Sequence, residues 1–236
     1  MALFKEQGIV LRTMRLGEAD RIVTILTQGS GKIRAVAKGI RKTRSKFGAR
    51  LEPFTHVDLL LYQGRELDIV TQADIITSFR EIRADYARFA AGEMILEAAD
   101  RVTPDRERNT RMFLLLLGSL RQLADVASDH GSVADSFLLR LTALAGFRPA
   151  LTACAECGEP NVARFSIQQG GMVCDNCRTG GTIRVGEGTV PYLTALLDDT
   201  ATAGDATTRN EGSNIVRAYL EYHLDRPLRA WAHIPR

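Results

Sequence analysis

The sequence predicts an α+β multidomain protein, in which an N-terminal five-stranded OB-type β-barrel precedes a helical bundle domain with an inserted four-cysteine ribbon. Three observations predict this fold class: short β-branched segments separated by turns, a later change to helical spacing of apolar residues, and four cysteines gathered in one stretch. The expected domains are residues 1–79 for the barrel, 80–150 and 186–236 for the two parts of the helical domain, and 151–185 for the ribbon.

Five short strands are expected in the first domain, over residues 8–16, 21–27, 32–38, 55–62 and 66–73. Residues 28–31, Gln-Gly-Ser-Gly, are typical of a tight hairpin turn. The third strand alternates apolar residues with Lys32 and Arg34, so one of its faces is apolar and the other charged. Because no helical pattern separates the strands, they favour a small barrel over a parallel sheet, and the OB type is the commonest at this strand number.

Beyond residue 84 the apolar residues recur at helical spacing. Two sets each lie on one helical face: Ala91, Met94, Ile95 and Ala98, and Phe113, Leu116, Leu117 and Leu120. Thr103 before Pro104 predicts one helix N-terminus, and Ser132 predicts another, for a helix that Gly146 ends. A last helix is expected over residues 214–224, after a mobile loop over 198–212. Helices with one apolar stripe each are expected to pack as a bundle.

The cysteines form two Cys-x-x-Cys pairs, Cys154 with Cys157 and Cys174 with Cys177, separated by about sixteen residues. Each such turn directs two thiolates at one ion, and two turns complete a tetrahedral site with bonds of about 2.3 Å. We therefore expect one structural Zn²⁺ per chain, without an open position for catalysis. Two alternatives are a pair of disulfides, which a reducing compartment disfavours, and a thioredoxin-like redox pair, which would need a βαβ pattern absent around these cysteines.

No catalytic constellation is recognisable, and we expect the protein not to be an enzyme. The histidines, which are His56, His130, His223 and His233, stand apart from one another and from acids at metal-ligand spacing, so a surface or satisfied core role is expected for each. Phosphate-loop, dinucleotide-binding and nucleophile-elbow motifs are missing. No run approaches the roughly 20 apolar residues of a membrane span, and the N-terminus lacks an export signal, which leads us to expect a cytoplasmic protein.

A formal net charge of only +3 conceals a strongly basic segment. Residues 32–50 contain no Asp or Glu and hold Lys32, Arg34, Lys38, Arg41, Lys42, Arg44, Lys46 and Arg50. These charges occupy one face of a strand and the connection after it. They therefore favour a surface that binds DNA phosphates over the alternative of a passive, solvated loop. The aromatic residues nearby are few, namely Phe47, Phe54 and Tyr62, which favours phosphate contacts over base stacking.

Three stretches of the chain carry a resemblance to a known family. The first contains Gly-Glu-Ala-Asp at residues 17–20, Gly31-Lys32, Ala37-Lys38-Gly39 and the basic run from Arg41 to Lys46. The second is FLLRLTALAGFRPALTACAECG at residues 137–158, and the third is YLEYHLDRPLRAW at residues 219–231. In this combination the chain resembles the RecO family of bacterial DNA-repair and recombination mediators over nearly its whole length.

The resemblance implies an OB fold, a helical domain and an inserted zinc ribbon. It further implies binding of single- and double-stranded DNA, annealing of complementary strands, and partnership with RecR to assist RecA on strands coated by single-strand-binding protein, with RecF and RecA as indirect partners. It also implies binding of the acidic, hydrophobic C-terminal tail of the single-strand-binding protein, for which a basic-rimmed apolar pocket among the helices would be suited. Two other hypotheses stay open: a zinc-ribbon adaptor that binds only proteins, and a thiol-dependent redox enzyme.

Overall fold

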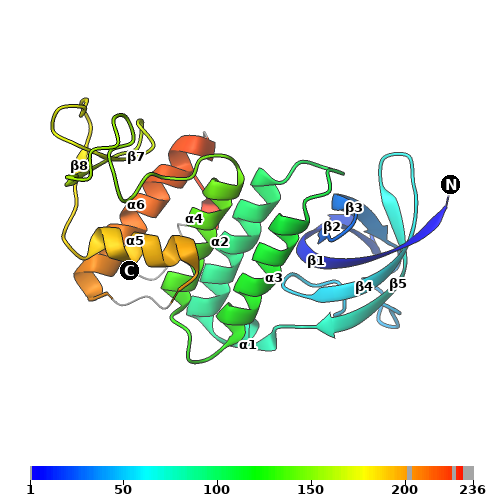
Figure 1. Ribbon diagram of the computed structural model, residues 1–236. Helices are drawn as coiled ribbons and strands as arrows, with labels where there is room; N and C mark the ends of the chain where they lie inside the picture. The colour runs from blue at the N-terminus through cyan, green and yellow to red at the C-terminus, as the bar shows by residue number, and fades with distance from the viewer. Residues whose placement is uncertain (1, 201–203, 225–226, 231–236) are drawn as a thin grey trace. The chain divides into compact units, whose positions relative to one another are not determined.

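The computed structural model describes residues 2–200, 204–224 and 227–230. Its elements, labelled in Figure 1, are β1 (Leu3–Leu16), β2 (Asp20–Thr27), β3 (Gly31–Ala37), β4 (His56–Tyr62), β5 (Asp68–Thr77), α1 (Arg80–Ala84), α2 (Tyr86–Val102), α3 (Thr110–Ala124), α4 (His130–Leu144), β6 (Arg164–Ser166), β7 (Gly171–Val173), β8 (Ile183–Arg184), α5 (Thr189–Asp198) and α6 (Ala206–Leu224). The chain divides into two compact units, Met1–Ser128 with Arg229–Arg236, and Asp129–Leu228.

Strands β1 to β5 close into a barrel in the order β1-β2-β3-β5-β4, the blue to cyan part of the chain in Figure 1. Only the β3–β5 pair is parallel. This is the connectivity of an OB-type barrel, as the sequence predicts. Strand β1 pairs with β4 from Leu3 to Ile9 and with β2 from Gly8 to Leu16, and the β1–β2 pairing has a bulge between Val10 and Arg12. Such bulges increase the twist that barrel closure requires.

The barrel core confirms the alternation expected from the sequence. In β3, Ile33, Ala35 and Ala37 are buried, whereas Lys32 and Arg34 are only half-buried on the other face. The same core takes in residues from outside the strands, Ile40, Phe47 and Leu51. The β3–β4 connection therefore contributes side chains to the hydrophobic core of the barrel.

In the first unit, α2 packs on β1 and on the next helix, α3. A Cβ atom at Gly92 would lie 2.6 Å from the Phe54 ring, so a glycine is what lets α2 approach the barrel this closely. The predicted helix N-terminus at Thr103 is wrong, because Thr103 is the C-terminal cap of α2. The next helix starts later, where the Asn109 side chain accepts a hydrogen bond from the Met112 amide at 2.9 Å.

In the second unit, two helix starts differ from the prediction. Asp129, not Ser132, caps α4, and its carboxylate accepts the Ser132 amide at 2.9 Å; Gly146 follows the end of this helix, as predicted. The expected loop over residues 198–212 is largely helical, because Asp205 accepts the Thr208 amide and α6 begins at Ala206. Residues 201–203 of that stretch lie outside the described residues.

Strands β6, β7 and β8 form a small sheet in the order β7-β6-β8, with both pairs antiparallel. The hairpin of β6 and β7 is the one expected between the cysteine pairs. Among the described residues, no helix combines the length and the hydropathy that a membrane span requires.

Candidate nucleic-acid interface and metal site

The connection from Lys38 to Arg50, here called the basic loop, is attached to the barrel at several points. Its apolar residues Ile40 and Phe47 are 7% and 1% exposed, and Leu51 just after it is fully buried. Each of these side chains belongs to the barrel core. Burial of the apolar positions leaves the intervening basic side chains on the outside.

The turn between β1 and β2 holds the start of the basic loop. The Asp20 carboxylate accepts a hydrogen bond from the Gly39 amide at 2.7 Å. The Arg41 amide donates to the Ala19 carbonyl at 2.9 Å, and the Arg41 guanidinium donates to the Glu18 carbonyl at 2.9 Å. The Gly-Glu-Ala-Asp motif at residues 17–20 is therefore a support for the loop, a role that the sequence alone did not reveal.

Six of the eight predicted DNA-binding residues lie on the basic loop and are exposed: Lys38, Arg41, Lys42, Arg44, Lys46 and Arg50. Three of them also stabilise the loop, since Arg41 contacts the turn, Lys46 donates to the Thr71 carbonyl at 2.9 Å, and Arg50 donates to the Lys46 carbonyl. Within the part of the chain that the structure describes, none of the six forms an ion pair with an acid. Their combined positive charge is left to attract external anions.

The remaining two, Lys32 and Arg34, have different surroundings. The Lys32 ammonium lies 3.2 Å from the Asp100 carboxylate and 3.4 Å from that of Asp105, and the side chain is only 12% exposed. Arg34 is half-buried, and its Nε has no hydrogen-bond partner among the described residues. Lys32 thus joins β3 to the α2 region, and a contribution of these two residues to DNA binding stays a prediction.

Two of the three aromatic residues near the basic loop are buried and not available for base stacking. Phe47 and Phe54 are each 1% exposed, and Tyr62 is half-buried. The Lys46 ammonium instead lies over the Phe47 ring at 5.0 Å, a cation–π contact within the protein. The loop presents charge without stacking platforms.

The four cysteines come together in the second unit as predicted. One sulfur from each of Cys154, Cys157, Cys174 and Cys177 lies within 4.8 Å of the others. The Cys157 and Cys174 sulfurs are 3.8 Å apart. A tetrahedral ion with bonds of about 2.3 Å needs sulfur–sulfur distances of about 3.8 Å, so the residues present fit a zinc ion.

The backbone around the cysteines favours a thiolate. Hydrogen bonds from the Cys174 and Cys157 backbones lower the pKa of the Cys154 thiol to about 6. Hydrogen bonding to the Cys157 and Cys174 sulfurs raises the pKa of Cys177 to about 12. A divalent cation reverses this second effect, because a coordinated thiol loses its proton. The knuckle geometry includes Gly158 at φ +77°, a backbone conformation that favours glycine.

The histidines are not brought together. His56 is 4% exposed on β4 and packs edge-on against Phe113, whereas His223 stacks on Phe147 with ring centroids 4.1 Å apart. The expected satisfied environment is wrong for His56, since neither ring nitrogen has a partner among the described residues, and burial lowers its pKa. His130 starts α4, and His233 lies outside the described residues. In the described part of the chain, the cysteine cluster is the one group arranged to hold a metal.

Two family models match the chain. "Recombination protein O N terminal" covers residues 1–79, and "Recombination protein O C terminal" covers residues 83–232. Similar curated proteins are the DNA repair protein RecO of Thermobifida fusca, 46% identical, and that of Frankia casuarinae, 48% identical, each aligned over 100% of both chains. The DNA repair protein RecO of a Nocardioides strain is 48% identical, over 99% of this chain and 100% of its own.

Proposed function

Because the chain belongs to the RecO family of DNA repair proteins, we propose that it binds single- and double-stranded DNA through the basic loop of its barrel. It then anneals complementary strands and, with RecR, assists RecA on strands coated by single-strand-binding protein, with RecF as an indirect partner. The site of action is the bacterial nucleoid in the cytoplasm.

The observation that carries the proposal is a fixed loop whose exposed charges are not neutralised. Because Ile40 and Phe47 are buried in the barrel and Asp20 holds Gly39, little chain entropy remains to be lost when DNA binds. Lys and Arg contacts to phosphates provide affinity that does not depend on base sequence. A mediator that acts wherever strands are exposed needs this kind of broad recognition.

Annealing on this surface is physical and makes or breaks no covalent bond. Two strands repel each other through their phosphates, and a basic surface that binds both lowers that repulsion and raises their local concentration. In this mechanism Lys38, Lys42 and Arg44 contact phosphates, and Arg41 together with Lys46 also keeps the loop in place.

We further propose that the four cysteines bind one structural zinc ion. Its chemistry is to hold the two Cys-x-x-Cys turns together, which ties the chain before β6 to the chain after β7. Since all four positions of a tetrahedral ion are filled by thiolates, substrate has no access to the metal. The C-terminal tail of single-strand-binding protein is a proposed partner on the basis of the family.

The decisive experiment measures fluorescence anisotropy of labelled single-stranded and duplex DNA over a salt series. The test variant changes Lys38, Lys42 and Arg44 to Ala, since these side chains make no hydrogen bond or ion pair with the rest of the described structure. The control variant changes the exposed residues Arg80, Arg111 and Arg121 to Ala, which alters net charge equally. We expect the test variant alone to bind weakly, with the log–log salt slope on duplex shallower by about 2.7.

Three other results would decide against the proposal. Equal losses in both variants would mean that net charge, not the basic loop, sets the affinity. Unchanged binding by the test variant would place the DNA site elsewhere. If the wild type failed to bind either DNA at low salt, the zinc-ribbon adaptor that binds only proteins would become the better hypothesis.

A further inference from the structure

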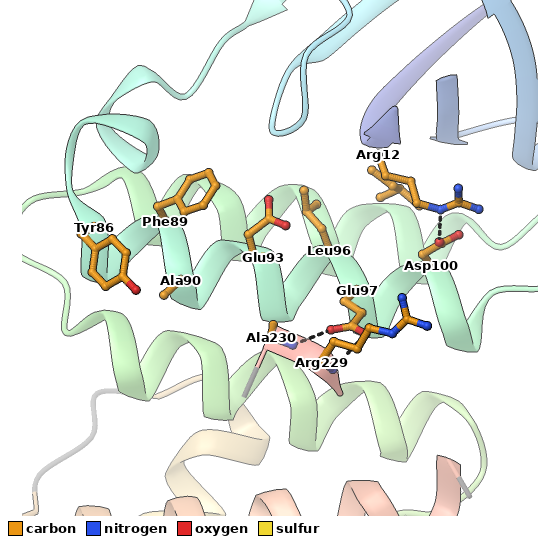
Figure 2. A pocket seen from close by; sticks show the side chains of 11 residues that line it. Arg12, Tyr86, Phe89, Ala90, Glu93, Leu96, Glu97, Asp100, Arg229 and Ala230 are labelled. Carbon is orange, nitrogen blue, oxygen red and sulfur yellow. Dashed lines mark hydrogen bonds and ion pairs between the residues drawn. The ribbon is translucent and has the colours of Figure 1, made fainter. Parts of the chain in front are cut away.

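A pocket of about 490 Å³ lies in the first unit, between α2, the β1 residues Leu11 and Arg12, and the residues Arg229 and Ala230 (Figure 2). This volume is typical of sites that hold small ligands or a few side chains. The proposed DNA contact does not use the pocket, since no residue of the basic loop lines it.

The pocket has an apolar base and an aromatic end. Leu11, Ala90 and Leu96 line it and are at most 3% exposed. Tyr86 and Phe89, at one end of the row of α2 side chains in Figure 2, are 65% and 38% exposed. Large exposed aromatic side chains beside an apolar pocket are typical of sites that anchor a protein partner.

Charged side chains complete the lining, namely Arg12, Arg229 and three acids of α2 that differ in their partners. Asp100 is paired with Arg12 at 2.6 Å. Glu97 accepts hydrogen bonds from the backbone amides of Arg229 at 3.0 Å and Ala230 at 2.9 Å. Glu93 makes no hydrogen bond or ion pair with any described residue, and Figure 2 shows it between Phe89 and Leu96.

The surroundings of Glu93 favour a cation. The side chain is half-buried, and burial together with the nearby Glu97 raises the pKa of Glu93. A carboxylate in partly apolar surroundings is costly unless a positive charge pairs with it. Arg and Lys side chains also bind the faces of Tyr and Phe rings, which are on the same side of α2 as Glu93.

We propose that this pocket docks a basic and apolar segment of a partner protein, with an Arg or Lys side chain paired to Glu93 and a neighbouring apolar side chain against Phe89 and Tyr86. The lining holds the cations Arg12 and Arg229 as well, but Arg12 is paired with Asp100, and the Glu93 carboxylate between Phe89 and Leu96 favours a basic occupant over an acidic one. Among the described residues, only the cysteine cluster brings enough ligand atoms together to hold a metal ion. The carboxylates of α2 are therefore not arranged for a metal ion. The apolar base and the volume exceed what one small cation would fill.

The experiment uses the full chain, labelled with ¹⁵N, and three peptides: acetyl-Leu-Arg-Leu-amide and the matched peptides with Gln or Glu in place of Arg. We expect the Arg peptide to shift the amide signals of Ala90, Glu93 and Ala230, and to bind at least about tenfold more tightly than the Gln peptide. The Glu peptide should leave these signals unchanged. Binding of the Arg peptide should weaken as salt is raised.

Two variants test the residues that carry the proposal. Glu93→Gln keeps the shape of the side chain and should weaken the Arg peptide about tenfold, without affecting the Gln peptide. Glu81→Gln is the matched control, because Glu81 is an exposed acid of α1 that does not line the pocket. Thermal unfolding of both variants verifies that they are folded.

The proposal is overturned if the Arg and Gln peptides bind with equal affinity. It is also overturned if the Arg peptide at millimolar concentration does not shift the amide signals of Ala90, Glu93 and Ala230. It is also overturned if spermidine displaces the Arg peptide with equal affinity, since the site would then be one for a small polyamine. An equal loss of peptide binding in Glu93→Gln and Glu81→Gln would show a general charge effect, which contradicts a site centred on Glu93.

Discussion

At the scale of single residues, the surroundings of a charge decide its role. Lys32 and Lys42 are both in the basic segment, yet Lys32 is 12% exposed beside Asp100, whereas Lys42 is exposed on the basic loop. A half-buried ammonium with a carboxylate partner stabilises the packing of β3 and the α2 region. An exposed ammonium without an acid partner is available to phosphate.

We expect Lys42→Ala and Lys32→Ala to separate these roles. Lys42→Ala should weaken binding to all duplex sequences and reduce the salt slope by about 0.9, with no change in stability. Lys32→Ala should cost about 1–3 kcal/mol in the free energy of unfolding, because it removes a largely desolvated charged hydrogen bond. DNA titrations measure the first effect and urea unfolding the second. Loss of DNA binding in Lys32→Ala and loss of stability in Lys42→Ala would contradict the roles inferred from their exposure.

Asp135 on α4 gives the stability of the second unit a pH dependence. Burial raises the pKa of this carboxyl to about 7, although the Ser213 hydroxyl donates a hydrogen bond to it at 3.2 Å. The folded state therefore keeps a proton between about pH 4 and pH 7 that the unfolded state has lost, so stability falls as pH rises through this window. A shift of the Asp135 pKa to about 7 corresponds to a change in the free energy of unfolding on the order of 4 kcal/mol.

The variant Asp135→Asn should lack this pH dependence. We expect the difference in unfolding free energy between Asp135→Asn and wild type to move in favour of the variant from pH 5 to pH 8, as measured by urea unfolding at each pH. A difference in unfolding free energy that is the same at every pH reflects how well the Asn amide packs at this position, and not the charge of Asp135. A difference that stays constant over this range would mean that Asp135 is ionised throughout.

At the scale of one element, the basic loop depends on its buried anchor. Phe47→Ala should cost about 3–5 kcal/mol of stability and speed hydrogen exchange across residues 38–50, with weaker DNA binding as a result. Phe47→Leu fills most of the space and should cost less than about 1.5 kcal/mol while the loop stays in place. If Phe47→Ala lowered stability and left both loop exchange and DNA affinity unchanged, the anchor would have no functional role.

The ribbon is the second element whose behaviour can be tested alone. Purified protein should contain one zinc ion per chain, and removal by a chelator should expose four reactive thiols and speed hydrogen exchange over residues 151–185. Exchange in the β1–β5 barrel should stay as it was, since the metal holds only the ribbon. Four thiols that react fully before chelation would contradict a zinc site.

At the scale of the whole molecule, local charge and net charge make different predictions. The chain has an isoelectric point near 8.8, so its net charge becomes negative at higher pH. The basic loop holds six Lys and Arg residues and no Asp or Glu, so its local charge does not follow the net charge of the chain. We expect DNA affinity at low salt to persist at a pH just above the isoelectric point, and its loss on crossing that point would favour a net-charge effect.

The sequence by itself determined the barrel, the helical region, the cysteine cluster and the family. Strand alternation in β3 and the helical spacing in α2 and α3 are local patterns, and the Cys-x-x-Cys turns are set by chain geometry within a few residues. The Gly-Glu-Ala-Asp motif at residues 17–20 and the basic run from Arg41 to Lys46 are also local patterns, so both can be recognised in the sequence. The sequence did not identify the residues that cap helices. Asp129 and Ser132 are both favourable N-cap residues, and tertiary packing decides which of them caps the helix.

Tertiary structure alone decided which charges are available. Lys32 meets Asp100 across 68 positions of sequence, and no local pattern reveals that distant carboxylate. The support of Gly39 by Asp20, and the position of Glu93 in a pocket where no described residue pairs with it, depend likewise on how separate elements pack. Electrostatic free energy depends on distance and desolvation in three dimensions, so the same residue type becomes a structural partner at one position and an exposed charge at another.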